Sequence, residues 1–217
     1  MTKKSKPYII GIAGGTASGK TAVAEILKES HPDEILLITH DNYYKAYGEI
    51  PKKEAQEKNF DYPGSIDNRL FIRHLKKLIA GGKVNLPHYN FFTHSRSKKT
   101  TPAESKPIII IEGILALSNP LVRKLMNLKI FIDADTDVRL ARRLERDLKE
   151  RDRSLKYSIM QYLNSAAPMY KIYVEPTKRY ADIIANNNSS LDQLKNFLDL
   201  VQTKIDQEIK LRKNDSN

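Results

Sequence analysis

Short apolar runs alternate with longer stretches of mixed polarity along most of this chain. Runs rich in branched aliphatic residues, which favour strands, occupy positions 8–13, 35–39, 108–111, 129–133 and 181–185. The run at 108–111, IIII, contains no polar position, which is typical of a central strand covered on both faces. Helical patterns separate most of these runs. This alternation predicts an α/β fold in which a mostly parallel central sheet carries helices on both faces.

Apolar residues at helical spacing identify the helices that cover the sheet. One helical pattern runs through 22–29, and another follows Asp67, which is suited to cap a helix, and stops at the glycine pair 81–82. Apolar positions recur at helical spacing from 191 to 205, which predicts a C-terminal helix at about 190–212. We expect these apolar stripes to pack in the core.

The length and composition of the chain limit its organisation. A chain of 217 residues is long enough for one well-buried domain with an insertion, which we expect at about 84–106, and too short for two comfortable domains. It contains no cysteine, its N-terminal sequence MTKKSKP lacks the apolar centre of a secretory signal, and no apolar stretch approaches the ~18 residues of a membrane helix. We therefore expect a single-domain cytoplasmic protein with no membrane partner.

The charge balance is strongly basic. The formal net charge is +11 and the isoelectric point is about 9.6. Such a balance suits a nucleic acid, a membrane surface or a polyanionic nucleotide such as ATP. Charge alone leaves these ligand classes open.

A glycine-rich segment, GIAGGTASGKT at 11–21, joins the first apolar run to the first helical pattern. It has more glycines than a turn needs and fits the pattern G-x-x-x-x-G-K-[ST], in which backbone N–H groups and a helix N-terminus cradle phosphates. In this pattern Lys20 reaches the β- and γ-phosphates as a catalytic cation, and the Thr21 hydroxyl holds Mg²⁺. The alternative is a glycine-rich turn with an incidental lysine. The phosphate-binding residues predicted by the pattern are Gly14, Gly15, Thr16, Ala17, Ser18, Gly19, Lys20 and Thr21.

Acidic residues follow the predicted strands, at the edge where open parallel sheets bind ligands. Asp41 comes after the second apolar run and Glu112 after the third. Glu112 is a candidate Mg²⁺ ligand together with Thr21 and Asp41. Asp41 is also a candidate general base that takes a proton from an acceptor hydroxyl. For both carboxylates, a capping or turn role is the alternative.

The segment 137–153, DVRLARRLERDLKERDR, concentrates arginines. Helical geometry places four of them on one face and an apolar stripe, which we expect to be buried, on the opposite face. Clustered guanidiniums need a nearby anion, which favours a lid at about 139–153 that closes over a transferring phosphoryl group. The alternative is a solvated surface relieved by neighbouring carboxylates. The arginines of the face are Arg139, Arg142, Arg143 and Arg146, the stripe includes Ala141, Leu144 and Leu148, and Arg151 and Arg153 extend the row into the next loop.

Several longer motifs, in order from about 8 to 185, resemble those of the uridine kinase and phosphoribulokinase family. The resemblance implies a three-layer α/β fold of the P-loop NTPase type with a small substrate-binding insertion and an arginine-rich lid. It also implies transfer of the γ-phosphate of ATP or GTP, with Mg²⁺, to the 5′-hydroxyl of uridine or cytidine in pyrimidine salvage. Besides the glycine-rich segment, the motifs are DNYYK, NFDYPGSID, PHYNFFTHSR, IIIEGILAL, RLARRLERDLKERDR and EPTKRYADIIA.

The resemblance assigns roles to individual positions. Asp41 matches the catalytic base beside the ribose hydroxyl, Arg146 matches a lid arginine, and Tyr89 with His94 matches the pair that binds the nucleobase. From the residues alone, Tyr89 equally suits a core position, His94 a hairpin position and Gln161 a solvated helix. The substrate-binding positions assigned by the resemblance are Asp41, Tyr44, Asp61, Tyr89, His94, Arg143, Arg151, Arg153 and Gln161.

The chain departs from the family motifs at a few positions. Asp152 stands where a glycine usually separates two arginines, and Asn42, Tyr62, Asn90 and Tyr170 replace other common residues. None of these departures removes a matched catalytic residue. Asp152 nevertheless adds a negative charge to the expected lid.

Other functions stay open at this point. A nucleotide switch or a nucleic-acid-dependent ATPase would also use the glycine-rich loop, although the sequence has neither the N-K-x-D segment of a GTPase nor a recognised module of clustered basic and aromatic residues. A sugar-phosphate kinase similar to phosphoribulokinase is the second alternative. We expect a small nucleoside partner, no nucleic acid, and a homo-oligomer.

Overall fold

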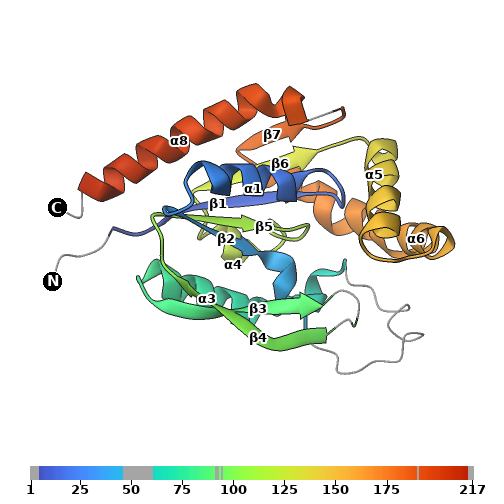
Figure 1. Cartoon of the computed structure of the whole chain (residues 1–217), viewed down its shortest axis with the longest axis horizontal. Helices are drawn as coiled ribbons and strands as arrows, with labels where there is room; N and C mark the ends of the chain where they lie inside the picture. Colours follow the sequence, from blue (N-terminus) through green and yellow to red (C-terminus); the bar gives the residue numbers. More distant parts are fainter. Residues whose placement is uncertain (1–4, 46–60, 91–92, 94, 190, 215–217) are drawn as a thin grey trace.

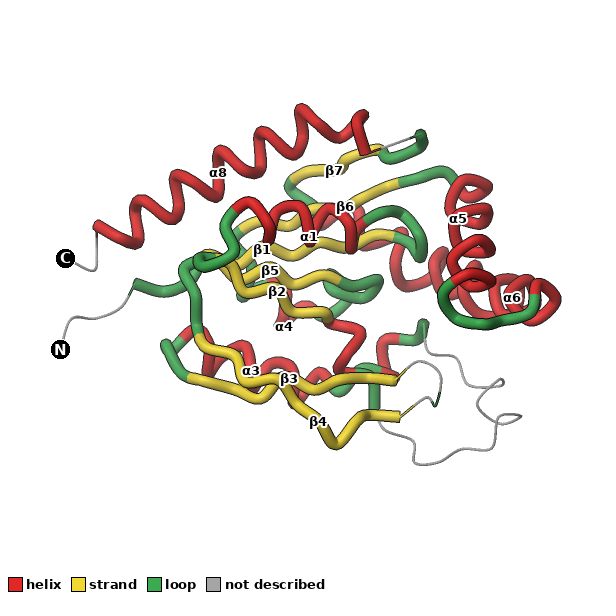
Figure 2. Tube along the Cα trace, in the orientation of Figure 1, coloured by secondary structure: helices red, strands yellow, loops and turns green. Residues whose placement is uncertain are grey.

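The computed structural model describes residues 5–45, 61–90, 93, 95–189 and 191–214 (Figures 1 and 2). A five-stranded sheet forms its centre, in the order β2-β5-β1-β6-β7, and each neighbouring pair of strands is parallel. This sheet confirms the predicted α/β architecture. Its strands are β1 (Tyr8–Gly14), β2 (Ile35–Thr39), β5 (Ile108–Glu112), β6 (Leu128–Asp133) and β7 (Ile183–Asn186).

The continuously apolar run in β5 is buried on both sides. Ile108 and Ile110 belong to one hydrophobic core, whereas Ile109 and Ile111 belong to the other. Alternate side chains of a strand point to opposite faces of the sheet, so a strand between two cores has no position for a polar side chain. This pattern places the first polar residue of the run at its carboxyl end.

Helices cover both faces of the sheet and complete the three layers (Figure 1). On one face, α1 (Lys20–Ser30) and α8 (Lys195–Asn214) contribute buried aliphatic side chains to the same core. On the other face lie α3 (Asn68–Ile79) and the short α4 (Pro120–Arg123). None of the helices within the described ranges is both long and apolar enough to cross a membrane.

An antiparallel hairpin lies beside α3 and occupies most of the segment predicted as an insertion. It consists of β3 (Lys83–Asn90) and β4 (Ser95–Glu104), which pair with each other and with no strand of the main sheet. Buried residues of the hairpin, including Val84 and Tyr89, belong to the core that α3 closes. The hairpin therefore extends one core beyond the central sheet.

One predicted strand begins later than its apolar run. β7 starts at Ile183, two residues inside the predicted 181–185. The Asp182 carboxylate accepts a hydrogen bond from the Lys129 backbone N–H at 2.7 Å. Because the Asp182 side chain accepts from this N–H, the Lys129 N–H is not available to pair with an earlier residue of a longer β7.

Several consecutive helical segments lead from the carboxyl end of β6 back to the start of β7. They are α5 (Thr136–Lys149), α6 (Leu155–Gln161), a π-helical turn Tyr162–Ala166, α7 (Ala167–Met169), a second π-helical turn Tyr170–Val174 and a 3₁₀ segment Glu175–Tyr180.

The prediction that α5 buries its apolar stripe is wrong. Its buried residues are Arg139, Arg143 and Asp147, whereas Leu148 is 46% exposed. The reason is that this helix packs against polar and aromatic groups of the site. The Arg139 guanidinium lies 4.0 Å from the centre of the Tyr170 ring, and its Nε donates to the Ala134 carbonyl at 2.9 Å. Buried arginines are tolerated when such partners replace water.

Candidate active site

The glycine-rich loop turns from β1 directly into α1. Gly19, which precedes α1, has a φ of 93°, in the left-handed region that favours glycine, and a Cβ there would lie 2.2 Å from Nδ2 of Asn187. That same Nδ2 donates to the Ser18 carbonyl at 2.8 Å. The loop is thus fixed from outside by the segment after β7. Its backbone and the N-terminus of α1 form the kind of cradle that binds phosphates.

Lys20 is the first residue of α1 and is only 7% exposed, so it is less solvent-facing than a residue of an open loop. It lines the same pocket as Thr16. The loop therefore brings one buried cation to the place where phosphates would bind.

Thr21 and Glu112 form the candidate metal site. The Thr21 hydroxyl donates to Oε2 of Glu112 at 3.1 Å, and Glu112, the last residue of β5, is 3% exposed. A hydroxyl and a carboxylate are suitable Mg²⁺ ligands when phosphates and water complete the shell. Within the described part of the chain, no group of three or more His, Asp or Glu side chains is placed to hold a metal by itself. These two side chains fit a metal that arrives with a nucleotide.

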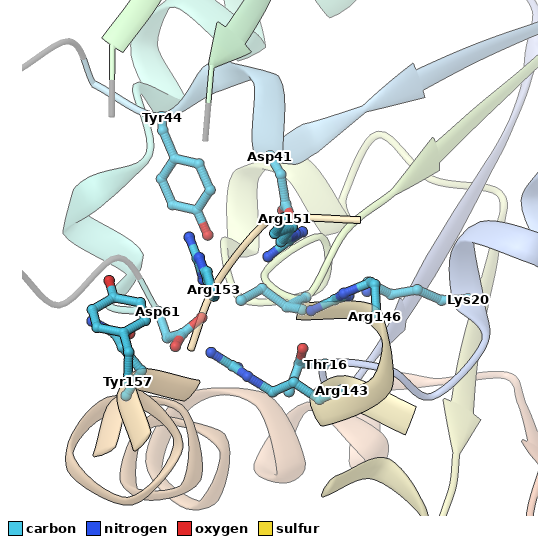
Figure 3. A pocket seen from close by; sticks show the side chains of 12 residues that line it. Thr16, Lys20, Asp41, Tyr44, Asp61, Arg143, Arg146, Arg151, Arg153 and Tyr157 are labelled. Carbon is cyan, nitrogen blue, oxygen red and sulfur yellow. The ribbon is translucent and has the colours of Figure 1, made fainter. Parts of the chain in front are cut away.

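A pocket collects most of the predicted residues (Figure 3). Residues from the loop, from the 3₁₀ turn after β2, from the segment 61–66 and from α5 to α6 line it. Its lining comprises Thr16, Lys20, Asp41, Tyr44, Asp61, Ile114, Arg143, Arg146, Arg151, Arg153, Tyr157 and Gln161.

Tyr157 and Ile114 were not predicted from the sequence. Tyr157 lies four residues before Gln161 on α6, so helical spacing from Gln161 was a usable signal. Ile114 follows β5 in an apolar run that gives no sign of a binding role.

One predicted nucleobase contact, Tyr89, is not among the residues that line this pocket. Tyr89 is 6% exposed and packs against Tyr44, with the ring centres 5.3 Å apart. His94 lies outside the described residues. Tyr44 therefore lines the pocket, and Tyr89 packs against Tyr44 outside the lining.

Asp41 brings a buried carboxylate into the pocket. It lies in the 3₁₀ turn His40–Tyr43 that follows β2, and its Oδ1 is buried without a hydrogen bond to any described residue. A Cβ at Gly113 would lie 2.9 Å from this oxygen, so glycine leaves the space beside it open. Burial raises the pKa of Asp41 to about 7, although the charge of Lys20 opposes the rise. A carboxyl with a pKa near neutrality is suited to accept a proton at physiological pH.

Asp61 is a second buried carboxylate in the lining. The Ser165 hydroxyl donates to its Oδ2 at 3.4 Å. Burial raises the pKa of Asp61, and the nearby charge of Arg143 acts in the opposite direction. Asp61 therefore offers a hydrogen-bond acceptor to a ligand on the side of the pocket formed by α6 and the following turn.

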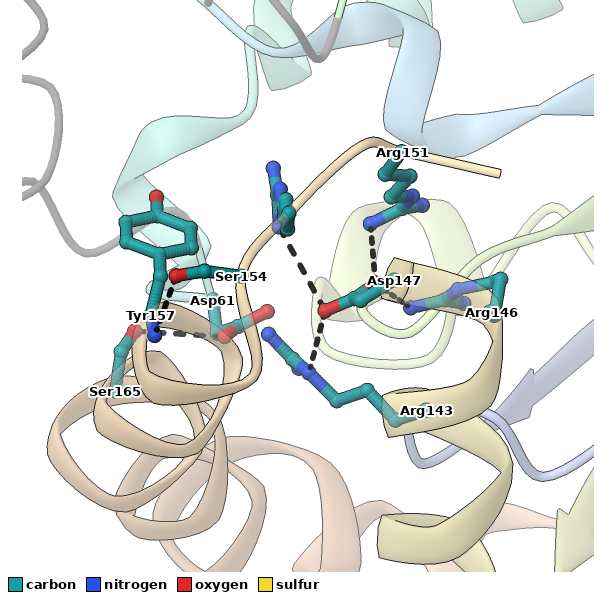
Figure 4. Close-up of polar contacts among 9 residues, drawn as sticks. Asp61, Arg143, Arg146, Asp147, Arg151, Ser154, Tyr157 and Ser165 are labelled. Carbon is teal, nitrogen blue, oxygen red and sulfur yellow. Dashed lines mark hydrogen bonds and ion pairs between the residues drawn. The ribbon is translucent and has the colours of Figure 1, made fainter. Parts of the chain in front are cut away.

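Four arginines surround one aspartate at the edge of the pocket (Figure 4); we call this group the arginine cluster. Asp147 is fully buried and receives ion pairs from two arginines of α5 and from two of the next segment. The distances are 3.5 Å from Arg143 Nε, 3.3 Å from Arg146 Nη2, 3.6 Å from Arg151 Nη1 and 3.8 Å from Arg153 Nη1.

The other two arginines of the predicted row point elsewhere. Arg142 donates to the carbonyls of Asn187 and Ser189, at 2.8 and 3.1 Å. Arg139 stacks on Tyr170 as described above. The prediction of a single row of arginines at the pocket is therefore only partly correct, because these two arginines bind groups outside the pocket lining.

Comparison with known proteins matches residues 9–192 to the family described as "Phosphoribulokinase / Uridine kinase family". A uridine kinase of Streptococcus gordonii is 43% identical over 212 residues, which is 97% of this chain and 100% of the relative. A uridine kinase of Chloroflexus aurantiacus is 48% identical over 179 residues, 82% of this chain and 86% of the relative.

Solved structures share the fold at low identity. One is described as a possible uridine kinase from Bacillus stearothermophilus, with 19% identity, a TM-score of 0.59 and coverage of 84% of this chain and 90% of that one. The phosphoribulokinase from Rhodobacter spheroides has 12% identity, a TM-score of 0.60 and coverage of 83% and 70%. These structures agree with the three-layer architecture.

Proposed function

Because this chain belongs to the phosphoribulokinase and uridine kinase family, we propose that it transfers the γ-phosphoryl group of ATP or GTP to the 5′-hydroxyl of uridine or cytidine. UMP or CMP is then the product, and the role is pyrimidine salvage. The observation that carries the proposal is the buried Asp41 carboxylate in the same pocket as Lys20 and the arginine cluster.

The proton transfer is assigned to Asp41. The Asp41 carboxylate, which lines the pocket, accepts the proton of the 5′-hydroxyl as the hydroxyl oxygen bonds to the γ-phosphorus. The bond between the γ-phosphorus and the bridging oxygen breaks, and the nucleoside diphosphate leaves with that electron pair. A pKa of about 7 allows Asp41 to be ionised before the reaction and to hold the proton afterwards.

Lys20 and the arginines supply positive charge around the transferring group. In phosphoryl transfer, charge spreads over the equatorial oxygens, and fixed cations stabilise it. Lys20 comes from the start of α1, whereas Arg146 and Arg151 come from α5 and the segment after it (Figure 3). Thr21 and Glu112 would hold Mg²⁺, which would neutralise part of the charge of the donor phosphates.

Other residues that line the pocket would hold the acceptor. Asp61, which lines the pocket, would accept hydrogen bonds from ribose hydroxyls, and a carboxylate there would disfavour an acceptor that already carries a phosphate. Tyr157 and Gln161 offer a ring and an amide to a planar base. Tyr89 would act on the base indirectly, by supporting the Tyr44 ring, and His94 stays a proposed base contact.

An acceptor panel tests the proposal. Purified protein with ATP or GTP and Mg²⁺ is offered uridine, cytidine, ribulose 5-phosphate or RNA, and the products are identified by mass spectrometry. We expect UMP and CMP from the two pyrimidine nucleosides. Product from ribulose 5-phosphate alone would replace the nucleoside assignment by a sugar-phosphate kinase, and nucleotide hydrolysis stimulated only by RNA would indicate an ATPase.

A further inference from the structure

Asp147 is unusual because a fully buried carboxylate faces four cations. A buried charge is costly unless other charges or hydrogen bonds replace water, so Asp147 depends on its neighbours. The dependence is mutual, because guanidiniums gathered in one place repel one another. The carboxylate is the group in the cluster that opposes this repulsion.

The contact distances indicate attraction without tight pairing. All four nitrogen–oxygen distances lie between 3.3 and 3.8 Å, longer than the ~2.7–2.9 Å of a strong charge-assisted hydrogen bond. Each guanidinium has five N–H donors, and a single longer contact engages only part of this capacity. The contacts to Asp147 therefore hold the arginines near one another without using all of their donors.

The backbone also connects Asp147 to the segment that carries two of the arginines. The Arg153 N–H donates to the Asp147 carbonyl at 3.0 Å, and the Glu150 N–H donates to the Arg146 carbonyl at 2.8 Å. The chain after α5 is thereby folded back onto the helix. This arrangement brings Arg151 and Arg153 to the carboxylate (Figure 4).

We propose that Asp147 is a positioning residue that acts as an internal anion, assembling the four guanidiniums at the pocket before an external phosphate binds. The electrostatics agree with the geometry: burial and the neighbouring arginines lower the pKa of Arg151 to about 10, whereas Asp147 opposes that shift. The catalytic consequence rests on the proposed kinase function. The anion-binding consequence is independent of it.

The test compares Asp147→Asn, which removes the charge and keeps the shape, with Glu145→Gln on the same helix. Glu145 is exposed and pairs with Lys149, so the control changes the net charge equally. Without nucleotide, we expect Asp147→Asn to melt at a lower temperature and to regain most of the loss when sulfate replaces chloride at equal ionic strength. Wild type and Glu145→Gln should gain much less from sulfate.

Kinetics supply the second readout. Asp147→Asn should lower kcat by about ten- to a hundredfold, as expected of misplaced catalytic cations, with a smaller change in the KM of the nucleoside. Equal sulfate responses in all three proteins, or an unchanged kcat in the folded variant, would overturn the proposal. If no acceptor is phosphorylated at all, the proposed kinase function fails, and the sulfate response still decides the role of Asp147.

A double variant covers the case in which Asp147→Asn does not fold. Removing one guanidinium with Arg153→Gln should relieve the repulsion, so Asp147→Asn/Arg153→Gln should be more stable than Asp147→Asn. A double variant that is as unstable as the single one, or less stable, would mean that Asp147 does not act by offsetting repulsion among the arginines, and it would overturn the proposal.

Discussion

The glycine-rich loop and the arginine cluster both contribute side chains to one pocket, but different interactions fix their conformations. The loop is fixed by hydrogen bonds to its backbone: Gly14 pairs with Ile132 in the sheet, and the Asn187 side chain donates to the Ser18 carbonyl. The cluster is fixed mainly by ion pairs to one carboxylate, Asp147. Backbone hydrogen bonds join neutral groups, whereas the ion pairs depend on the charge of each group around the buried carboxylate. We call these two parts of the pocket the loop half and the cluster half. Substitutions in the two halves should therefore differ in their effects on activity and stability.

Lys20→Ala should have the largest effect, because it removes the fixed cation of the loop half. We expect kcat/KM to fall by roughly 10³–10⁵, with no recovery in added sulfate. The measurement is steady-state kinetics of uridine phosphorylation. Lys28→Ala, at the far end of the same helix, is the matched control and should stay within about twofold of wild type. Near-normal turnover by Lys20→Ala with an unchanged melting temperature would contradict the loop assignment.

Asp41→Asn removes the proposed base, which lines the same pocket as Lys20 and the arginines. We expect kcat to fall by roughly 10²–10⁴, with a smaller effect on nucleotide binding. Wild-type kcat should decline as the pH falls below about 7, because Asp41 must be ionised. The kcat of the variant should not show this decline. A collapse of ATP affinity with kcat preserved would instead make Asp41 a ligand of the metal.

The same variant should be more stable than wild type at alkaline pH. The folded-state pKa of Asp41 is raised from 3.8 to about 7, so between these values the folded state retains a proton that the unfolded state loses. Stability contributed by this group therefore falls as the pH rises through that window. Melting temperatures at pH 4 and pH 8 test this prediction, because the gain from Asp41→Asn should appear only at the higher pH.

Arg146→Ala acts on the cluster half and should have an intermediate effect. We expect kcat to fall by about ten- to a hundredfold, with less change in ATP affinity measured without acceptor, because the arginine stabilises the transferring group. Lys149→Ala, an exposed cation on the same helix, is the control. Equal losses of kcat and ATP affinity would indicate a contact to the ground-state phosphates.

Substitutions of Asp152 should have the smallest effect and test the backbone within the cluster half. Asp152 has a φ of 49°, a left-handed conformation that aspartate tolerates better than alanine. Asp152→Ala should lower the free energy of unfolding by about 0.5–1 kcal/mol, whereas Asp152→Gly should be nearly neutral, because relief of the strain offsets the added entropy of the unfolded chain. Urea unfolding measures both. A stabilising Asp152→Ala would show that this backbone is not strained.

The contrast between the two halves also explains what the sequence could predict. The loop is local: its glycines, Lys20 and Thr21 form one continuous motif between a strand and a helix, and both elements occur close to the predicted positions. The strands were equally clear, because an unbroken aliphatic run such as 108–111 has few alternatives to a buried strand.

The cluster was predictable only in part, because its geometry depends on contacts between distant residues. Helical spacing placed Arg139 and Arg142 in the same row as Arg143, but Tyr170 and the carbonyl of Asn187 draw them away. The central position of Asp147 follows from the return of the chain after α5, which no local pattern encodes. Burial of polar side chains on α5 likewise depends on the elements that pack there.

The position of β1 has a consequence for the order in which the protein is made. β1 lies between β5 and β6, with Tyr8 beside Ile108 and Ile10 beside Leu128. Such pairings between distant residues form slowly, because a long loop must close first. On the ribosome, the strand that leads into the phosphate loop is synthesised early but must wait for both neighbours. The first binding element to be translated therefore gains the sheet pairing that supports it only after both neighbouring strands are made. Until then the nascent chain carries an unpaired aliphatic strand that chaperones can recognise.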